Sequence, residues 1–177
     1  MPCVSTAIRR ERSEAMIRQL MIGALAALSL TACHKNLPDQ SSEAQAFLAT
    51  NAKAPGVQTL PSGLQYRVVR SGPATGLKPQ LGDEVKVNYE GKLITGEVFD
   101  SSYERGVPAA MPLRGLIKGW QEALPMMRPG DEWILYVPPN LGYGVEGAGG
   151  SIPPGAALIF RIELIAVLPA EGRVQQG

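Results

Sequence analysis

Two stretches of regular alternation constrain the fold of this chain more than any other feature. In EVKVNYEG, residues 84–91, apolar or aromatic side chains alternate with polar ones, and LIFRIEL, residues 158–164, follows the same pattern. Successive residues of a β-strand point to opposite faces, so each stretch predicts a strand with one buried face. The predicted buried faces hold Val85, Val87 and Tyr89 in the first strand and Leu158, Phe160, Ile162 and Leu164 in the second.

Shorter stretches predict further strands and a single helix. Four segments rich in β-forming residues lie at 63–72, 97–102, 110–115 and 132–138. Only residues 115–127, GLIKGWQEALPMM, place apolar side chains at helical spacing, and prolines close that segment. Several strands, one short helix and two final strands describe an α+β domain, with one helix packed on an antiparallel sheet.

The N-terminal segment predicts export. LMIGALAALSLTAC contains an apolar run of roughly a dozen residues, which is too short for a transmembrane helix of about 20 but suits a signal peptide. Its last four residues, Leu30 to Cys33, match the bacterial lipobox. We therefore expect residues 1–32 to be a lipoprotein signal peptide, removed before Cys33 receives a diacylglycerol lipid. The alternative is an ordinary signal peptide with a chance Cys.

The region after Cys33 predicts a tether. Residues 33–58 begin with the polar HKNLPDQSS, and Ser41 or Ser42 would cap a short helix. Phe47 and Leu48 are too few apolar residues to define an interface, so we expect a frayed linker helix. The folded domain is then expected over residues 59–170, followed by a disordered tail at 171–177.

Composition excludes several kinds of function. Residues 1–32 hold four of the 17 basic and two of the 16 acidic residues, which leaves 13 against 14 and no basic run. We therefore expect no nucleic-acid binding. The only histidine is His34, and the only cysteines are Cys3 and Cys33; Cys3 is absent if translation begins at Met16 instead of Met1. A Ser–His–Asp triad, a Cys–His pair and a His- or Cys-ligated zinc site are therefore excluded from the domain, and we expect no metal or cofactor.

Other catalytic patterns are equally poorly supported. GYGVEG resembles a dinucleotide-binding fingerprint, but it precedes a Gly- and Pro-rich loop and not a helix. A glycosidase-like pair of carboxylates would need a second acid near Asp100, and the neighbouring Glu97 and Glu104 are expected to face solvent. The loop at residues 139–156 is long and contains the apolar Leu141, Tyr143 and Ile152. A long loop with apolar residues of its own indicates a functional loop.

The order of the motifs resembles the FKBP-type peptidyl-prolyl cis/trans isomerases. The motifs are VKVNYEGKL, FDSSYERG, LIKGWQEAL, LGYG, IPPGA and LIF, and they follow one another within about residues 59–168. The resemblance implies a bent five- to six-stranded antiparallel sheet wrapped around one short helix, with an apolar pocket that takes a proline ring. The approach to the domain resembles that of the macrophage infectivity potentiator proteins. Their long dimerisation helix does not fit between Cys33 and the domain, so we expect a monomeric lipoprotein.

The resemblance also implies the site residues. Six are implied to be catalytic: Tyr89, Phe99, Asp100, Trp120, Tyr143 and Phe160. Four more are implied to bind substrate: Met111, Leu116, Ile117 and Ile152. Many members have an aromatic residue at the position of Met111, so we expect an altered substrate preference. With no histidine or thiol beside it, Asp100 is expected to stay ionised and to accept hydrogen bonds from the Tyr89 hydroxyl or Arg105.

The sequence therefore predicts a peptidyl-prolyl cis/trans isomerase that assists the folding of exported proteins. The alternative is a non-catalytic chaperone or a module that binds proline-containing segments. Expected partners are proline-containing chains, the membrane through the lipid on Cys33, and macrolides such as FK506. His34 is not the Asp that retains many lipoproteins in the inner membrane. We therefore favour the outer membrane, with the domain in the periplasm or at the cell surface.

Overall fold

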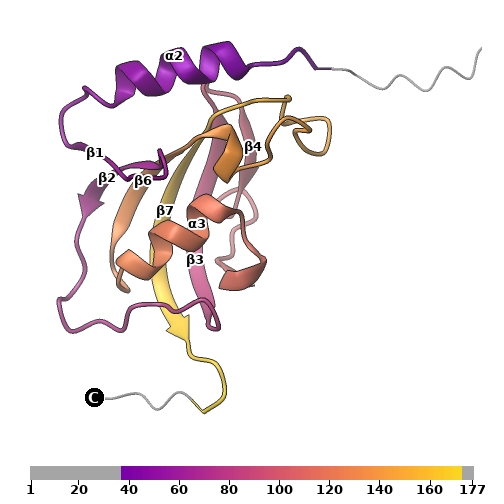
Figure 1. The fold of residues 1–177 in the computed structure, drawn as a ribbon. Helices are drawn as coiled ribbons and strands as arrows, with labels where there is room; N and C mark the ends of the chain where they lie inside the picture. The colour runs from indigo at the N-terminus through magenta and orange to yellow at the C-terminus, as the bar shows by residue number, and fades with distance from the viewer. Residues whose placement is uncertain (1–36, 173–177) are drawn as a thin grey trace, which may run out of the picture. The chain divides into compact units, whose positions relative to one another are not determined.

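The chain folds as an antiparallel sheet with a short helix on one face and a longer helix across one end (Figure 1). The structure is a computed structural model, and it describes residues 37–172. Its strands are β1 (Val57–Thr59), β2 (Gln65–Arg70), β3 (Glu84–Leu93), β4 (Val98–Ser101), β5 (Ala109–Pro112), β6 (Glu132–Val137) and β7 (Leu158–Leu168). Its α-helices are α2 (Ser41–Asn51) and α3 (Lys118–Ala123), and single 3₁₀ turns are η1 (Leu113–Gly115), η2 (Leu124–Met126) and η3 (Pro139–Leu141).

The two alternating stretches form the centre of the sheet. The strand order is β1-β2-β6-β7-β3-β4, and every pairing is antiparallel. β3 and β7 pair along their whole lengths, from Glu84 opposite Leu168 to Leu93 opposite Leu158. The other edge of β3 is shared, since β5 pairs with its first half and β4 with its second.

Helix α3 covers the face of the sheet that we call the inner face (Figure 1). Trp120, Ala123 and Leu124 are almost completely buried there. They meet the inward side chains of the strands, which include Val85, Val87, Leu135, Val137, Phe160, Ile162 and Leu164. The alternation in β3 and β7 thus predicts the core correctly. The helix is shorter than the predicted 115–127, because the chain tightens into 3₁₀ turns on both sides of α3.

The predicted fold class is confirmed, although the sheet has seven strands and not five or six. The additional strand is β1, whose three residues carry no strand pattern of their own. A turn joins β1 to β2, with Leu60 N–H donating to Leu64 O at 2.8 Å and Gly63 N–H donating to Leu60 O at 2.9 Å. β1 therefore forms because the turn folds it back on β2.

Helix α2 lies across one end of the sheet, where it contacts side chains of β2 and β6 that point away from the inner face (Figure 1). Its Ala44 is fully buried, and the Phe47 ring lies 6.1 Å from the ring of Tyr136. Asn51 Nδ2–H donates to Gln65 Oε1 at 2.8 Å, and Gln65 Nε2–H donates to Leu48 O at 2.9 Å. The helix cap is Gln40, without a side-chain bond, and not the predicted Ser41 or Ser42. The prediction of a short helix is confirmed, but the helix is docked instead of frayed.

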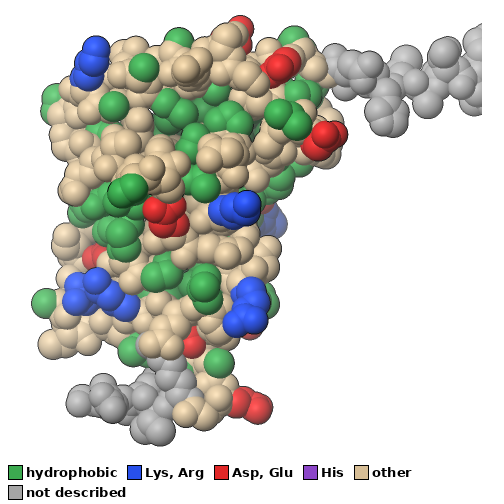
Figure 2. Space-filling model, in the orientation of Figure 1, with side chains coloured by type: hydrophobic (Ala, Val, Ile, Leu, Met, Phe, Trp, Pro, Cys, Tyr) green, Lys and Arg blue, Asp and Glu red, His purple; other side chains and the backbone are tan. Residues whose placement is uncertain are grey.

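The surface carries charges of both signs, scattered over the face drawn in Figure 2. On the face drawn in Figure 2, apolar side chains reach the surface below α2 and over α3, with basic and acidic side chains spread between them. No helix in residues 37–172 has the length and hydropathy needed to cross a bilayer. The predicted signal peptide, Cys33 and His34 lie outside the described residues, as do residues 173–177 of the predicted tail.

Candidate functional site

A single pocket gathers nine of the ten side chains predicted to form the site. It lies between α3 and the inner face of the sheet and encloses about 240 Å³. Its lining residues are Tyr89, Phe99, Asp100, Met111, Gly115, Leu116, Ile117, Trp120, Tyr143 and Phe160. Pockets for drug-sized ligands usually measure about 300–1,000 Å³. The volume therefore suits one small apolar ring.

Four aromatic rings form the floor and one wall of the pocket. Trp120 lies at the centre, with its ring 5.3 Å from Tyr89 at 85° and 5.3 Å from Phe160 at 88°. Phe99 continues the series at 5.7 Å and 86° from Phe160. Such edge-to-face contacts are each worth about 0.5–1.5 kcal/mol beyond the area they bury. The rings hold one another in place, so the pocket has a fixed shape.

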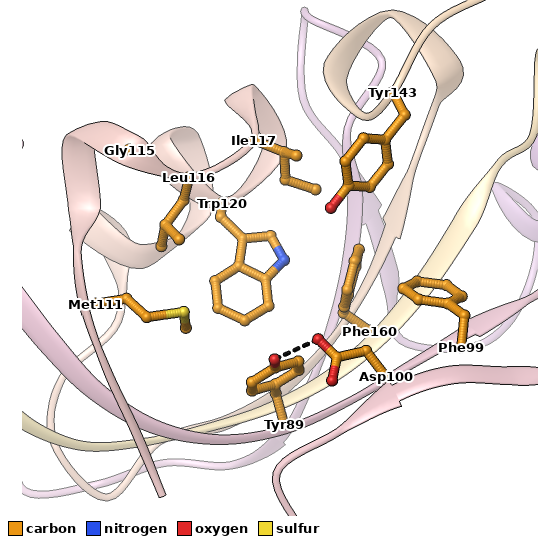
Figure 3. A pocket seen from close by; sticks show the side chains of 10 residues that line it. All are labelled: Tyr89, Phe99, Asp100, Met111, Gly115, Leu116, Ile117, Trp120, Tyr143 and Phe160. Carbon is orange, nitrogen blue, oxygen red and sulfur yellow. Dashed lines mark hydrogen bonds between the residues drawn. The ribbon is translucent and has the colours of Figure 1, made fainter. Parts of the chain in front are cut away.

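Flexible aliphatic side chains complete the opposite wall. Figure 3 shows Met111 and Leu116 on one side of Trp120, with Phe99 and Phe160 on the other. Met111 comes from β5 and is half-buried. Gln121 Nε2–H donates to Leu116 O at 2.6 Å and to Arg114 O at 3.0 Å, which fixes the turn before α3. Gly115 of this turn also lines the pocket, and sequence reasoning did not identify it.

Asp100 and Tyr89 form the polar edge of the pocket with Arg105. The Tyr89 hydroxyl donates to Asp100 Oδ2 at 2.5 Å, and Arg105 donates both to Asp100 Oδ1 and, at 2.9 Å, to the Tyr89 hydroxyl oxygen. The prediction that Asp100 accepts hydrogen bonds is confirmed for both partners. Burial alone would raise the pKa of Asp100, but these hydrogen bonds and the charge of Arg105 hold it below its usual 3.8. Asp100 is therefore a carboxylate at neutral pH.

Two hydrogen-bond donors in the pocket have no partner among residues 37–172. The Trp120 Nε1–H is buried without an acceptor. The Tyr143 hydroxyl points into the pocket from the loop after β6 (Figure 3). Two effects raise the pKa of that hydroxyl: mainly its burial, and also the nearby negative charge of Asp100. Of the two donors, the Tyr143 hydroxyl faces the space that a ligand would occupy.

Two residues that sequence reasoning missed hold the aromatic wall in place. Gly91 of β3 lies under the rings of Phe99 and Phe160, and a Cβ at this position would be 2.7 Å from both. Ser102 is fully buried, and its hydroxyl accepts the Tyr89 N–H at 2.8 Å. The pattern of glycines and serines in the sequence gives no signal for these roles, because they depend on which strands become neighbours.

Ile152 lies elsewhere than the resemblance implies. It does not line the pocket; it is 7% exposed and belongs to the hydrophobic core. Its backbone pairs with Ala148, closing a small turn within the long loop. Ile152 therefore anchors the loop from below, while Tyr143 of the same loop reaches the pocket. No group of three or more His, Cys, Asp and Glu side chains within residues 37–172 could hold a metal ion.

Comparison with known proteins agrees with this geometry. The family model for "FKBP-type peptidyl-prolyl cis-trans isomerase" matches residues 76–165, and the model for the "domain amino terminal to FKBP-type peptidyl-prolyl isomerase" matches residues 6–68. The first of these matches contains every residue that lines the pocket.

Three relatives illustrate the similarity. The chain is 58% identical to the "Peptidyl-prolyl cis-trans isomerase Mip" of Coxiella burnetii over 71% of this chain and 54% of that protein. It is 44% identical to the "Outer membrane protein MIP" of Legionella longbeachae over 77% and 58%, respectively. The crystal structure of FkpA from Escherichia coli superposes with a TM-score of 0.70 at 36% identity, covering 94% of this chain and 75% of that one.

These relatives set the extent of the similarity. The chain spans between a half and two thirds of the length of the curated relatives named above. The family match covers the strands β3 to β6, helix α3 and most of β7. Because that match extends over half of the chain and the fold and pocket agree with it, the chain belongs to the FKBP-type peptidyl-prolyl cis-trans isomerase family.

Proposed function

We propose that this protein is a peptidyl-prolyl cis/trans isomerase that binds X–Pro segments with the proline ring in the pocket on Trp120. The observation that carries the proposal is a fixed aromatic pocket of about 240 Å³ that lacks a nucleophile or a titrating base. Isomerisation about an amide bond needs neither of these groups, because no covalent bond is made or broken.

The physical chemistry of the reaction fits an apolar pocket. The X–Pro bond rotates over a barrier of about 18–20 kcal/mol, which arises from lost amide resonance. The twisted transition state separates less charge between carbonyl and nitrogen than the planar amide does. A pocket that excludes water therefore disfavours the planar form relative to the twisted form. Each gain of about 1.4 kcal/mol in this difference increases the rate ten-fold.

The residues of the pocket take separate parts in this proposal. Trp120 supports the proline ring, and Tyr89, Phe99 and Phe160 form the walls against which it packs. The Ile117 N–H, which precedes α3, and the Tyr143 hydroxyl donate no hydrogen bond within residues 37–172, so both can bind carbonyl groups of the substrate. Asp100 accepts hydrogen bonds and orients Tyr89 without moving a proton. Met111 and Leu116 contact the residue that precedes the proline.

A protease-coupled isomerisation assay on an X–Pro peptide tests the proposal. At micromolar protein concentrations we expect the cis-to-trans rate to rise well above the uncatalysed rate, which corresponds to tens to hundreds of seconds. A rate equal to that of buffer would reject the enzyme. Peptide binding measured in the same samples distinguishes the second candidate, a non-catalytic binding module. Such a module would bind the peptide without accelerating its isomerisation.

We further propose that the protein is anchored by a lipid on Cys33 and faces the periplasm or the exterior at the outer membrane. The lipobox at residues 30–33 supports this, as does the similarity to a relative named as an outer membrane protein. Fractionation of cells that express the full chain is the test. Wild-type protein should be in the membrane fraction, and Cys33→Ser should be released or remain unprocessed; a soluble wild-type protein would reject the anchor.

Two smaller proposals concern ligands and assembly. A macrolide such as FK506 is expected to compete with the X–Pro peptide for the pocket, with an affinity altered by Met111. The protein is expected to act as a monomer, because only about 25 residues separate Cys33 from the domain. Competition in the peptide assay tests the first proposal. Sedimentation of the processed protein tests the second, since a concentration-independent dimer mass would reject it.

A further inference from the structure

The turn before α2 contacts the loop that carries Tyr143. We infer that Asp39, Gln40 and Ser41 form a positioning element that holds Tyr143 at the pocket, acting through the backbone of the loop. The inference rests on the proposed function, because it concerns how a residue of the proposed substrate site is placed. In Figure 1 the N-terminal end of α2 lies beside the loop that follows β6.

Two backbone hydrogen bonds join the turn to the residue next to Tyr143. Gln40 N–H donates to Pro154 O at 2.9 Å, and the following residue, Gly155, donates its N–H to Gly144 O at 2.9 Å. Gly144 is adjacent to Tyr143 in the chain. The two ends of the loop are therefore joined by the bond between Gly155 and Gly144, and Pro154 at this junction is bound to the turn before α2.

The contact at Gly155 leaves no room for a side chain. Gly155 has φ of +68°, and a Cβ on it would lie 2.1 Å from Ser41 Oγ and 2.4 Å from Asp39 Oδ1. Asp39 Oδ1 itself accepts hydrogen bonds from Ser41 N–H at 2.9 Å and from Ser41 Oγ–H at 2.6 Å. The carboxylate thus fixes the shape of the turn against which the loop backbone packs.

The other end of α2 is fastened to the sheet and not to the loop. Asn51 and the Leu48 carbonyl both bind the side chain of Gln65 in β2. The turn is therefore attached to a support that does not move with the loop. Tyr143 needs such a support, because it is 41% exposed and its hydroxyl has no partner within residues 37–172.

Loosening the turn should weaken substrate binding more than it slows the chemical step. A mobile Tyr143 must be ordered when the peptide binds, and this cost is the same for the planar and the twisted amide. A change shared by both states raises KM and leaves kcat nearly constant. A merely structural role for the turn would instead lower the thermal stability with KM unchanged in the folded protein.

Two glycine variants of the full chain provide a matched test. Gly155→Ala forces a side chain against Asp39 and Ser41, whereas Gly149→Ala changes a glycine with φ of +59° in the same loop that has open space around it. We expect Gly155→Ala to raise KM about five-fold beyond the effect of Gly149→Ala. An unchanged KM, or an equal change in both variants, would overturn the inference.

Asp39 provides a second test that does not depend on glycine. Asp39→Ala removes the acceptor for Ser41 and should raise KM. Asp39→Asn keeps an Oδ1 acceptor, so its KM should stay close to that of the wild type. In a Tyr143→Ala background, Asp39→Ala and Gly155→Ala should have no further effect on KM. Additive effects with Tyr143→Ala would show that the turn acts elsewhere and would overturn the inference.

Amide hydrogen exchange separates this inference from the proposed function. The amides of Gln40 and Gly155 donate the two hydrogen bonds, so their exchange should accelerate together in Asp39→Ala and remain slow in Asp39→Asn. This measurement needs no catalysis. If the wild-type protein is inactive, the proposed function fails while exchange and peptide binding still test the turn; if exchange is unchanged, the inference fails whatever the activity.

Discussion

The inner and outer faces of the sheet are built from neighbouring residues of the same strands but by different physical means. On β7, Phe160 and Ile162 point into the core and pocket, while Arg161 and Glu163, which alternate with them, point outward. The inner side chains are fixed by ring packing and by the exclusion of water. The outer ones are held by ion pairs in contact with solvent.

The outer face carries a chain of four charged side chains. Arg70 Nη2 lies 2.6 Å from Glu163 Oε1, and Arg161 Nε donates to Glu132 Oε1 at 2.5 Å. Arg70 also approaches Glu132 at 3.7 Å, and Asn88 Nδ2–H donates to Glu163 Oε2 at 3.1 Å. Both arginines are more than half exposed. The Glu132 side chain is only 8% exposed, whereas Glu163 is 30% exposed. Solvent therefore screens the Arg70–Glu163 pair, which is expected to contribute only about 0–1 kcal/mol.

The contrast between the two faces predicts whether a substitution changes activity or only stability. A side chain lost from the inner face leaves a gap in a fixed surface that the substrate must match, so it should change activity. A charge lost from the outer face is replaced by water and should change stability slightly. Four predictions test this contrast, ordered from the largest expected effect to the smallest.

Phe99→Ala should have the largest effect. It removes one wall of the pocket and the ring contact with Phe160, so kcat/KM for an X–Pro peptide should fall roughly thirty-fold, as expected for about 2 kcal/mol of lost apolar contact. Tyr103→Ala is the matched control, because Tyr103 is an exposed aromatic near the charges of Arg161 and Glu163 on the outer face. Equal activities of the two variants would contradict the assignment of the pocket.

Gly91→Ala should have the next largest effect. A methyl group at this position would collide with the Phe99 and Phe160 rings, which must then shift. We expect kcat/KM to fall roughly ten-fold and the free energy of unfolding to fall by about 1–3 kcal/mol, the usual range for overpacking. Gly82→Ala is the control, since its added methyl group makes only an ordinary contact of 3.8 Å with Ala170. A Gly91→Ala variant with wild-type kinetics would exclude a role for ring placement.

Asp100→Ala should reduce kcat/KM by only a few-fold, because Asp100 orients Tyr89 and does not transfer a proton. The pH profile of the wild-type enzyme tests the same point. The pKa of Asp100 lies below 3.8, because hydrogen bonds and the Arg105 charge outweigh its burial, and burial first of all raises the pKa of Tyr89 and Tyr143 above 10.0. The kcat/KM should therefore be flat from about pH 6 to about pH 9. A bell-shaped profile in this range would indicate acid–base catalysis instead.

The sequence predicts the inner face better than the rest of the molecule. Alternation in β3 and β7 identifies Val85, Val87 and Phe160 as inward residues, because a strand with one buried face has apolar side chains at every second position. The resemblance to the family supplies the pocket residues, and Asp100 has the predicted hydrogen bonds. The helix on the inner face follows from the spacing of its apolar side chains around Trp120.

What the sequence does not predict depends on contacts between distant segments. Helix α2 has few apolar residues, and it docks because Gln65 and Tyr136 of the sheet happen to face it. Gly91 matters only because β4 and β7 bring two rings together over it. The family resemblance implies that Ile152 binds substrate, but the turn that Ile152 makes with Ala148 directs its side chain into the core. No local pattern encodes these neighbours.

Glu163→Gln should have the smallest effect and sharpens the contrast from the outer side. The kcat/KM should be that of the wild type, and the free energy of unfolding should fall by less than about 1 kcal/mol at neutral pH. Hydrogen bonds from Asn88 and then Arg70 hold the pKa of Glu163 below its usual 4.5 in the folded state. Its ionised form therefore stabilises the fold above the unfolded pKa, and this contribution disappears as the pH falls through the folded pKa.

The stabilities of wild type and Glu163→Gln should consequently differ most above about pH 5 and converge in acid. Urea unfolding at several pH values measures this difference, and added salt should reduce it, because the Arg70 pair is exposed. A constant difference across the acid range would mean that Glu163 acts through its shape and not its charge. A loss of activity in Glu163→Gln would mean that the two faces are coupled through β7, contrary to the separation argued from Phe160 and its outward neighbours.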